Sequence, residues 1–506
     1  MEPTMLLTFI GAIQVLFGLG LFLAGSIEAM FAFLLVSALF GGSAAIVLPA
    51  LGGSSIPPVQ FALVFMALRL LVPGAGHGAA VGQAARANIW LATFILYGAA
   101  LAFIGPRLFA GQIDVTPMRG KVEARYISMR AYIYSTRPLS FSTQNITTTV
   151  YLVGTLLTAM AAHVVCSKER GRRVFVRTMA IAGLVHGLIG FLSVAGKGTP
   201  VDTVLALFRN GSYAQLDHSY RGFVRMAGLW PEASGFAWFG INWFAFLFEC
   251  WLRRVDPRYT GPAAFVLAAA LLCSTATTAY VGLGLYAAMV LGRSLLLPGA
   301  MPADRALIVA GAGLAMTVLV TALMIAHPVL VTDATDLLRH MTVDKGQSLS
   351  GEQRGFWAWQ GWHAFVETHG IGIGPGSFRS SSLATAVLGC TGLIGATAMI
   401  VHVISAFKPT RLSTYVPSPD LALSTGAACA WAAVVDAVVA SLSSPTCDPG
   451  TDFAILTGAA LALRPIVPRL TPWRGPVRQL PPLQLSPSMA LASAMPSPVF
   501  SPQPAE

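Results

Sequence analysis

The sequence contains few charged side chains. Asp, Glu, Lys and Arg make up 10% of its 506 residues, whereas 55% are hydrophobic. Soluble domains carry about 25% charged residues, so this composition excludes an ordinary soluble protein. Many apolar runs approach the roughly 20 residues that a membrane helix needs, and the short alternating strands of a membrane barrel are lacking. We therefore expect an all-α, polytopic integral membrane bundle.

The chain also lacks the motifs of common catalytic and metal sites. Its six cysteines have neither metal-ligand nor redox spacing, and most lie in apolar runs, where cysteine behaves as a small hydrophobic residue. No set of His, Cys, Asp and Glu has the spacing of a metal site. Neither a Walker loop nor a serine-hydrolase elbow occurs. The net charge of +11 is scattered over short loops, so we expect no nucleic-acid partner. Because the motifs above are missing, we also expect no metal and no cofactor.

The apolar runs predict a membrane domain over residues 1–466 with 12 or 13 transmembrane helices. Runs 262–275 and 277–292 are either two short helices or one long tilted helix that is broken around residues 274–278. Residues 467–506 are rich in Pro and Ser and predict a disordered cytoplasmic tail. The runs lie near residues 5–26, 28–50, 58–73, 88–106, 148–165, 178–196, 232–252, 262–275, 277–292, 306–326, 383–406, 420–441 and 452–466.

Lys and Arg in the short loops predict the orientation of these helices. Basic loops near residues 168–177, 253–258, 293–305 and 408–411 are assigned to the cytoplasm. Alternation then places three polar segments outside, at about 107–147, 197–231 and 327–382. The first is net basic, but long loops obey the rule weakly, so we keep it outside. A basic external loop favours an anionic ligand such as a phosphate, which makes Arg125 and Arg130 candidate substrate-binding residues.

The longest polar segment follows an apolar helix that ends near His327 and precedes one that starts near Leu383. His363 and Glu367 are four residues apart, so the carboxylate could orient the imidazole on a helix. An amphipathic helix at the membrane interface is the alternative, which explains the tryptophans well and Arg354 poorly. The polar and aromatic side chains of the segment are Arg354, Trp357, Trp359, Trp362, His363, Phe365, Glu367 and Arg379.

A second polar group lies before the apolar run at 232–252. If this segment is helical, Arg221 and Arg225 share one face, and Glu232 sits at the mouth of the helix that starts beside Pro231. Two guanidiniums can hold a pyrophosphate through paired hydrogen bonds, which lysine does poorly. The alternative is that both arginines extend to the membrane interface.

Two further features are candidates for a role. The glycine-rich run at residues 370–376 lacks the strand and the acidic residue of a dinucleotide-binding motif. We expect a tight turn that re-enters the bundle, with backbone amides that could form an anion-binding nest. Asp436 lies inside an apolar run, where a carboxylate is a candidate functional group.

The order of these blocks resembles the bacterial superfamily of O-antigen ligases and polymerases. The similar blocks are Arg354 with Trp357, the turn at residues 372–376, the Thr-Gly-Leu-Ile-Gly run at 391–395, and residues 225–232 with their Arg, Gly, Pro and Glu. Residues 54–58 and 142–147 are similar to the exopolysaccharide polymerase branch. Ligases usually carry a histidine soon after the glycine-rich turn, where this chain has Arg379 and three serines. That departure favours a polymerase.

The resemblance implies a metal-independent glycosyltransferase in the bacterial inner membrane, with its active site facing the periplasm. It would transfer a growing glycan from a polyprenyl diphosphate onto a lipid-linked repeat unit. On this hypothesis Arg225 and Arg354 stabilise the diphosphate with help from Arg221 and Arg379, Glu232 or His363 is the base, and Trp357 and Trp359 bind sugar. Candidate partners are polyprenyl-diphosphate-linked oligosaccharide, membrane lipid, a flippase, and chain-length or export proteins.

Two alternatives remain open. A ligase would transfer the finished glycan to another acceptor. A flippase or transporter of lipid-linked oligosaccharide is the alternative outside the enzymes, and it should show charged residues inside helices and paired broken helices from inverted repeats. The sequence shows neither clearly.

Overall fold

Helices account for nearly all regular structure in the computed structural model of this chain. The structure describes residues 5–49, 54–72, 76–118, 133–211, 219–220, 223–326, 335–336, 339 and 348–463. They belong to a unit that spans Met1–Arg464. The predicted tail at 467–506 lies outside the described residues.

The helices follow the predicted apolar runs. They are α1 (Phe9–Ala24), α2 (Ile27–Ser37), α3 (Pro58–Leu71), α4 (Gly78–Ala87), α5 (Ile89–Leu108), α7 (Thr143–Cys166), α8 (Glu169–Ala195), α9 (Pro200–Leu207), α10 (Ala233–Leu252), α11 (Pro257–Cys273), α12 (Thr277–Leu296), α13 (Ala303–Ala326), α15 (Leu349–Glu367), α16 (Leu383–Phe407), α17 (Leu412–Tyr415), α18 (Leu421–Ala440) and α19 (Gly450–Ala462). Each predicted run contains one helix, and α4, α9, α15 and α17 lie outside the runs. The run predicted at 28–50 is wrong in its second half, because α2 ends at Ser37 and residues 46–48 form a strand.

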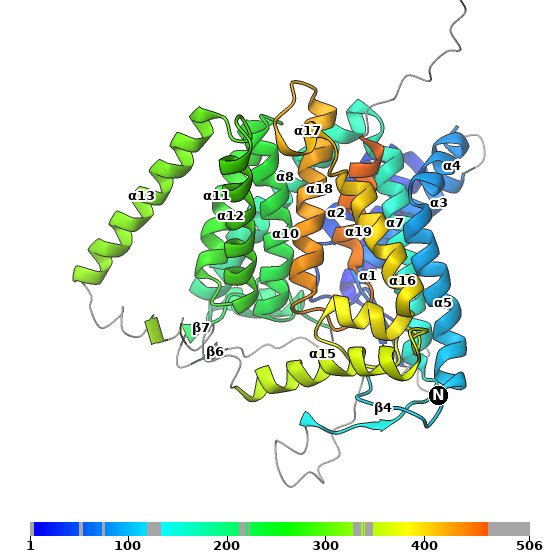
Figure 1. The fold of residues 1–506 in the computed structure, drawn as a ribbon. Coiled ribbons are helices and arrows are strands. Elements are labelled where there is room, and N and C mark those ends of the chain that lie inside the picture. The colour runs from blue at the N-terminus through cyan, green and yellow to red at the C-terminus, as the bar shows by residue number, and fades with distance from the viewer. Residues whose placement is uncertain are drawn as a thin grey trace, which may run out of the picture. The chain divides into compact units, whose positions relative to one another are not determined.

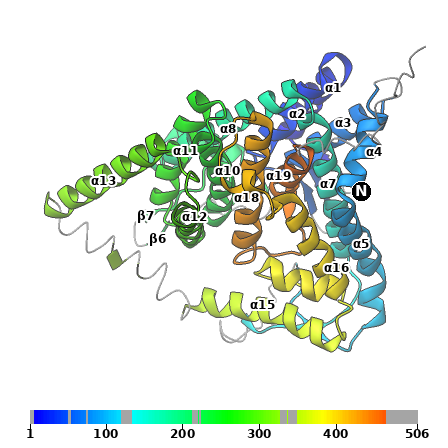
Figure 2. The ribbon, with the colours of Figure 1, turned by 45° about the horizontal axis from the view of Figure 1, so that its top comes forward.

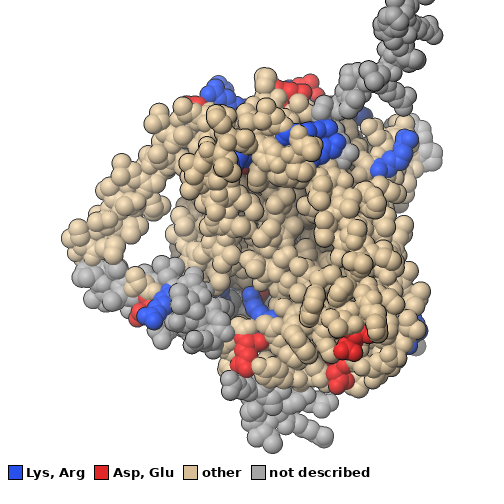
Figure 3. Space-filling model, viewed as in Figure 1, with Lys and Arg blue, Asp and Glu red and all other residues tan. Residues whose placement is uncertain are grey.

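Eight of the described helices are long and apolar enough to cross a membrane. They are α5, α7, α8, α10, α12, α13, α16 and α18, and α1, α2, α3 and α19 are shorter apolar helices. On the face shown in Figure 3, the charged side chains gather toward the two ends of the bundle, while its middle is nearly free of them. The all-α, polytopic membrane fold is therefore confirmed.

The uncertain pair of apolar runs forms two helices. α11 ends at Cys273 and α12 begins at Thr277. Between them Thr275 has a φ of 53°, in the left-handed region that a helix cannot contain. One long tilted helix is therefore excluded.

α10 is the most enclosed of the long helices and packs against α8, α11, α12 and α18 (Figures 1 and 2). Its aromatic side chains fill the centre. The ring centroids of Phe175 in α8 and Phe246 lie 5.0 Å apart, and those of Trp243 and Phe246 lie 5.8 Å apart with the rings edge to face. Elsewhere small residues bring helices together, since a Cβ on Gly458 of α19 would lie 2.2 Å from the Ala159 carbonyl oxygen in α7. Such close packing replaces the hydrophobic effect between helices in lipid.

α13 differs from the other long helices because it contains no buried residue. In Figures 1 and 2 it extends away from α11 and α12. Since its 24 residues are almost all apolar, lipid is the neighbour that suits this surface.

Three sets of short strands were not predicted from the sequence. β1 (Leu6–Leu7), β2 (Ile46–Leu48) and β3 (Ser54–Ile56) form one antiparallel sheet. β4 (Asp114–Val115) pairs with β5 (Arg137–Pro138), and β6 (Ser219–Tyr220) pairs with β7 (Phe223–Val224). Strands this short give no periodic signal in a sequence.

Candidate functional site

Described parts of the three polar segments, which include β4, β6, β7 and α15, lie toward one end of the bundle, which we call the α15 end (Figure 1). There α15 lies next to β4 in Figure 1. The Thr116 amide donates to Oε1 of Gln360 in α15 at 3.0 Å, and Gln360 Nε2 donates to Thr116 Oγ1 at 2.9 Å. The Arg379 amide donates to the Thr116 carbonyl oxygen at 2.9 Å. Segments that the sequence assigns to one side of the membrane therefore share one end.

The glycine-rich turn is fixed by close backbone packing. The glycines at 370, 372, 374 and 376 have φ values of 80°, 96°, 90° and 84°. A Cβ on Gly374 would lie 2.3 Å from the Leu101 carbonyl oxygen in α5, and one on Gly376 would lie 2.4 Å from the Gln144 carbonyl oxygen in α7. The predicted tight turn that re-enters the bundle is confirmed.

Central amides of this turn are already bonded to protein. The Ile373 amide donates to the Gly389 carbonyl oxygen at 2.8 Å, and the Gly374 amide donates to that of Cys390 at 2.9 Å. An anion-binding nest needs successive free amides. The prediction of such a nest is therefore wrong for this part of the turn, which instead joins α15 to the bundle.

α16 is broken where it receives the turn. Gly392 has a φ of 58° and a ψ of −155° inside α16, so the helix is interrupted at the Thr-Gly-Leu-Ile-Gly block. The Leu393 amide donates to the Gly370 carbonyl oxygen at 2.8 Å. Both glycine blocks that carry the family resemblance thus meet in one joint.

Asn145 ties the same joint to α7. Ser142 and Asn145 form a capping box at the start of α7. The fully buried Asn145 side chain also donates from Nδ2 to the Pro375 carbonyl oxygen at 2.8 Å and to Ser377 Oγ at 3.0 Å. The block at 142–147 therefore positions the loop that leads to Arg379.

Arg225 and Arg354 come together at the α15 end, and they are the two residues assigned to the diphosphate. Arg225 is half-buried, and its Nη2 donates to the Thr275 carbonyl oxygen at 3.5 Å. Burial lowers the pKa of the Arg225 guanidinium, and the charge of Arg354 lowers it further, while Glu232 and Tyr280 act in the opposite direction. Two guanidiniums with one carboxylate between two loops form a concentrated positive charge suited to an anion.

The hypothesis that Arg221 and Arg225 share one face of a helix is wrong. β6 and β7 pair Ser219 with Val224 and Tyr220 with Phe223, so the chain on both sides of Arg221 is extended. Tyr, Phe and Val favour strands, and this preference outweighs the helical spacing of the arginines. Arg221 itself lies outside the described residues, as do Arg125 and Arg130.

Glu232 occupies the position expected from the sequence. It is the N-cap residue of α10, which starts at Ala233, and its Oε1 accepts a hydrogen bond from Ser234 Oγ. The side chain is half-buried and lies in the electrostatic environment of Arg225. A helix N-terminus favours negative charge, so this end of α10 suits an anionic ligand.

Arg354 sits in the first half of α15. Ser348 caps this helix by accepting the Gly351 amide at 3.1 Å. The Arg354 carbonyl oxygen accepts a hydrogen bond from Ser381 Oγ at 2.5 Å, so the serines that follow Arg379 hold this part of α15 in place. The Arg354 side chain is half-buried.

The remaining arginine of this segment stacks on a tryptophan. The Arg379 guanidinium carbon lies 4.5 Å from the ring centroid of Trp357, which is a cation–π contact. Arg379 is exposed and Trp357 is half-buried. The pair therefore presents its charge to solvent at the same end as Arg354.

An aromatic row continues along α15. Trp359 is 51% exposed and stacks on two neighbouring rings. Its ring centroid lies 4.7 Å from that of His363, with 9° between the ring planes, and 5.9 Å from that of Phe356, with 19° between the planes. His363 Nδ1 lies 3.7 Å from Glu367 Oε1, beyond hydrogen-bond distance. The predicted pair is thus on one helix face, but in this structure the imidazole is oriented by stacking on Trp359.

Three residues near the site, Thr275, Tyr280 and Tyr134, were not predicted from the sequence. Thr275 and Tyr280 flank the α11–α12 break and contact or influence Arg225. Tyr134 donates to Glu352 Oε1 at 2.5 Å and packs on Phe356 at 4.9 Å. They lie far from the arginine blocks in the chain, so no local pattern links them to the site.

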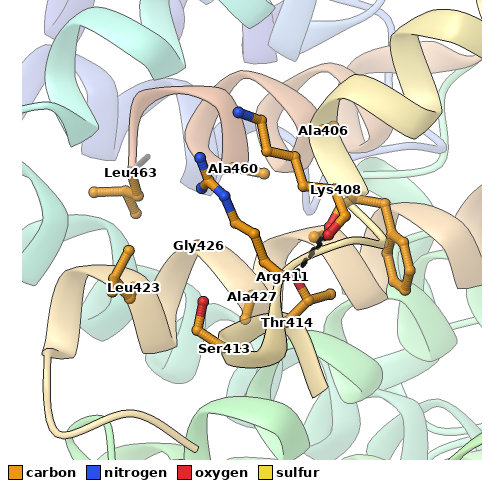
Figure 4. Close-up of a pocket in the computed structure, with 12 residues that line it drawn as sticks. Ala406, Lys408, Arg411, Ser413, Thr414, Leu423, Gly426, Ala427, Ala460 and Leu463 are labelled. Carbon is orange, nitrogen blue, oxygen red and sulfur yellow. Dashed lines mark hydrogen bonds between the residues drawn. The ribbon is translucent and has the colours of Figure 1, made fainter. Parts of the chain in front are cut away.

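The opposite end, which we call the α17 end, carries the short basic loops. There Arg177 pairs with Asp256 at 3.0 Å, and Arg254 pairs with Asp304 at 2.9 Å. A hollow at this end is lined by Lys408 and Arg411 (Figure 4). Both lie just after the C-terminus of α16, where basic side chains stabilise the helix dipole.

Charged residues also occur inside the helices at the α17 end. Glu249 is fully buried and pairs with Arg253 at 3.0 Å and with Arg293 of α12 at 2.8 Å, while Tyr286 donates to it at 3.1 Å. Charged residues inside helices were not clear from the sequence, whereas the structure places Glu249 within α10 and Arg293 within α12. In the sequence, Glu249, Arg253 and Arg293 stand next to basic loops, so they resemble ordinary residues at helix ends.

Among the described residues, no group of three or more His, Cys, Asp and Glu side chains could hold a metal ion. No protein-family model matches the chain, and no curated protein is significantly similar to it in sequence.

Proposed function

We propose that this protein is a polysaccharide polymerase of the bacterial inner membrane, with its α15 end facing the periplasm. It would transfer a growing glycan from a polyprenyl diphosphate onto a lipid-linked repeat unit. The observation that carries the proposal is the meeting of Arg225 and Arg354 with Glu232 at one end of a membrane bundle. A fixed anion site beside an acidic group suits the transfer of a sugar from a diphosphate.

The reaction places a specific demand on these side chains. A hydroxyl oxygen of the acceptor sugar attacks the anomeric carbon of the donor, the bond from that carbon to the diphosphate oxygen breaks, and the diphosphate leaves with the electron pair. Arg225 and Arg354 would stabilise the charge that develops on the leaving group. One such preorganised donor contributes on the order of 10²–10³ in rate.

The proton of the attacking hydroxyl needs an acceptor. Glu232 suits this role because it is ionisable, half-buried and electrostatically coupled to Arg225. His363 is the other candidate, on the exposed aromatic row of α15. That row, with Trp359 and Trp357, offers flat apolar faces on which sugar rings could stack.

A second candidate function is transport of a lipid-linked oligosaccharide. It is favoured by the buried ions Glu249, Arg253 and Arg293, by the buried Asp436, and by the break in α16 at Gly392. Intramembrane charges and broken helices are typical of transporters. The ligase alternative has no separate structural observation in its favour.

The deciding experiment is carried out on a strain that lacks this protein. Lipid-linked glycans are extracted, sized and assigned to a membrane face, and the secreted polysaccharide is weighed. Single repeat units on the periplasmic face without polymer support the polymerase. Full-length polymer retained on its lipid carrier supports a ligase, and repeat units trapped on the cytoplasmic face support a flippase.

A further inference from the structure

Two carboxylates inside the bundle form no ion pair with any basic residue that the structure describes. Asp436 of α18 is fully buried, and Asp452, in the first turn of α19, is 6% exposed. Both face α10, which lies against α18 (Figure 1). None of the ion pairs formed by the described residues involves either carboxylate.

Neutral donors from α10 satisfy only part of this cluster. Asp436 Oδ1 accepts from Trp238 Nε1 and from Asn242 Nδ2, both at 2.8 Å. Asp452 Oδ1 accepts from Trp243 Nε1 at 3.3 Å. The Oδ2 atom of Asp436 and the Oδ1 atom of Asn242 are buried and have no hydrogen-bond partner within the described part of the chain.

The two unpartnered oxygens belong to one hydrogen-bonded pair. Asn242 Oδ1 shares a carbon with the Nδ2 that donates to Asp436, and Asp436 Oδ2 shares a carbon with the oxygen that accepts. Both atoms are acceptors, so neither can satisfy the other. A buried acceptor without a donor and a buried charge without a counter-charge are both unfavourable, and one bound cation removes both costs.

We propose that Asp436, Asn242 and Asp452 form a binding site for a monovalent cation, which is taken up as a proton or as Na⁺. As a proton, it forms an O–H bond at Asp436 Oδ2 and donates to Asn242 Oδ1. As Na⁺, it is coordinated by these two oxygens, with the Asp452 carboxylate nearby. This site is separate from Arg225 and Arg354 and does not depend on the polymerase proposal.

The surroundings define which other groups could respond to pH. On α19 the charge that reaches Asp436 is that of Asp452. In the α18–α19 loop Asp448 accepts from Thr155 Oγ1 at 2.8 Å and from the Gly450 amide at 3.0 Å. On α10 the facing side chains are neutral, and His402 of α16 packs against Phe453, next to Asp452, at 5.9 Å.

The test uses the purified full-length protein in lipid nanodiscs and measures its Tm. NaCl is compared with N-methylglucamine chloride at constant ionic strength over a pH series. A saturable rise in Tm with Na⁺, on the order of a few degrees, identifies a Na⁺ site. No response to Na⁺, with a Tm that falls as pH rises, identifies a proton site. A Tm that is insensitive to both Na⁺ and pH overturns the proposal.

Two variants assign the effect to this cluster. Asp436→Asn supplies a neutral side chain with its own N–H donor, so it should lose the response to Na⁺ or pH. Asp420→Asn is the matched control, because Asp420 is the exposed N-cap of the same helix and asparagine is an equally good cap. An Asp436→Asn protein that responds like the wild type overturns the proposal.

The proposal stays testable when Asp436→Asn does not fold. The wild-type protein is then titrated in infrared spectra, where a protonated buried carboxyl group gives its own C=O band, and ²²Na⁺ binding is measured on the same sample. Either a carboxyl band that titrates or stoichiometric ²²Na⁺ binding is expected. The absence of both overturns the cation site while leaving the polymerase proposal unaffected.

Discussion

Arg354 lies close enough to Arg225 for its charge to lower the pKa of the Arg225 guanidinium, although Arg225 precedes α10 and Arg354 belongs to α15. Bringing like charges together is unfavourable unless something compensates, and Glu232 supplies one negative charge for two positive ones. An anionic ligand bound here would interact favourably with both guanidiniums. The first two predictions follow from this relationship.

Arg225→Ala and Arg354→Ala should each lower polymer synthesis by on the order of 10²–10³, because each removes one donor to the leaving diphosphate. Arg225→Lys should recover only part of the rate, since an ammonium group cannot form paired hydrogen bonds with phosphate oxygens. Polymer yield is measured in a complemented deletion strain with matched protein levels. Arg173→Ala is the control, because Arg173 is an exposed arginine that pairs with Glu169 four residues away on α8. Normal polymer from the Arg354→Ala strain would refute the assignment.

Glu232→Gln should reduce the rate by about 10²–10⁴, the usual range for loss of a general base, while keeping the N-cap geometry of α10. His363→Ala should have a much smaller effect, because His363 packs on Trp359 rather than beside the arginines. Rates of both variants are compared across a pH series in membranes. A larger loss for His363→Ala than for Glu232→Gln would move the base to α15.

Gly392→Ala should prevent stable folding. The added Cβ would lie 2.0 Å from the Gly370 carbonyl oxygen, and the φ of 58° is unfavourable for alanine. The atoms of Gly370 and Ile371 that the Cβ meets are backbone atoms, which cannot move aside as a flexible side chain can. The contact between α16 and the glycine-rich turn must therefore open. Membrane expression and Tm in detergent are the measurements. Gly284→Ala on α12 is the matched control, because nothing lies within 4 Å of its added Cβ. Equal Tm values for the two variants would contradict the packing described for the turn.

Asn145→Ala should destabilise the protein by about 1–3 kcal/mol, because it leaves the buried Pro375 carbonyl oxygen without its donor. The same change should lower polymer yield by loosening the loop that carries Arg379. Thr147→Ala, two residues along α7, is the control, because Thr147 is half-buried and its hydroxyl donates to the Thr143 carbonyl oxygen in the same helix. Thermal unfolding and polymer yield are measured on both. An unaltered yield with reduced stability would limit Asn145 to a structural role.

Much of the fold could be predicted because a membrane helix is a local property of the sequence. α16 begins at Leu383, as expected, and α13 ends at Ala326, one residue before the expected boundary. The β6–β7 hairpin could not be predicted, since two-residue strands have no periodicity and the spacing of Arg221 and Arg225 suggested a helix. Contacts such as Asn145 with Pro375 depend on how α5, α7 and α16 pack. The site residues could be chosen by type, but their neighbours Thr275 and Tyr280 required the structure.

Glu249 provides the last prediction, which concerns stability rather than activity. It is the single carboxylate between Arg253 and Arg293, and all three side chains are almost completely buried. Glu249→Gln leaves two buried guanidiniums without a counter-charge, and removing one partner of such a group costs about 3–5 kcal/mol. Arg253 also donates to the Thr414 carbonyl oxygen at 2.6 Å, so α17 should loosen together with the ends of α10 and α12. The measurement is Tm, with protease sensitivity of the loop around α17. Glu169→Gln is the control, because its pairing with Arg173 is exposed and such pairs contribute little. A Glu249→Gln protein as stable as this control would show that the cluster does not hold the α17 end together.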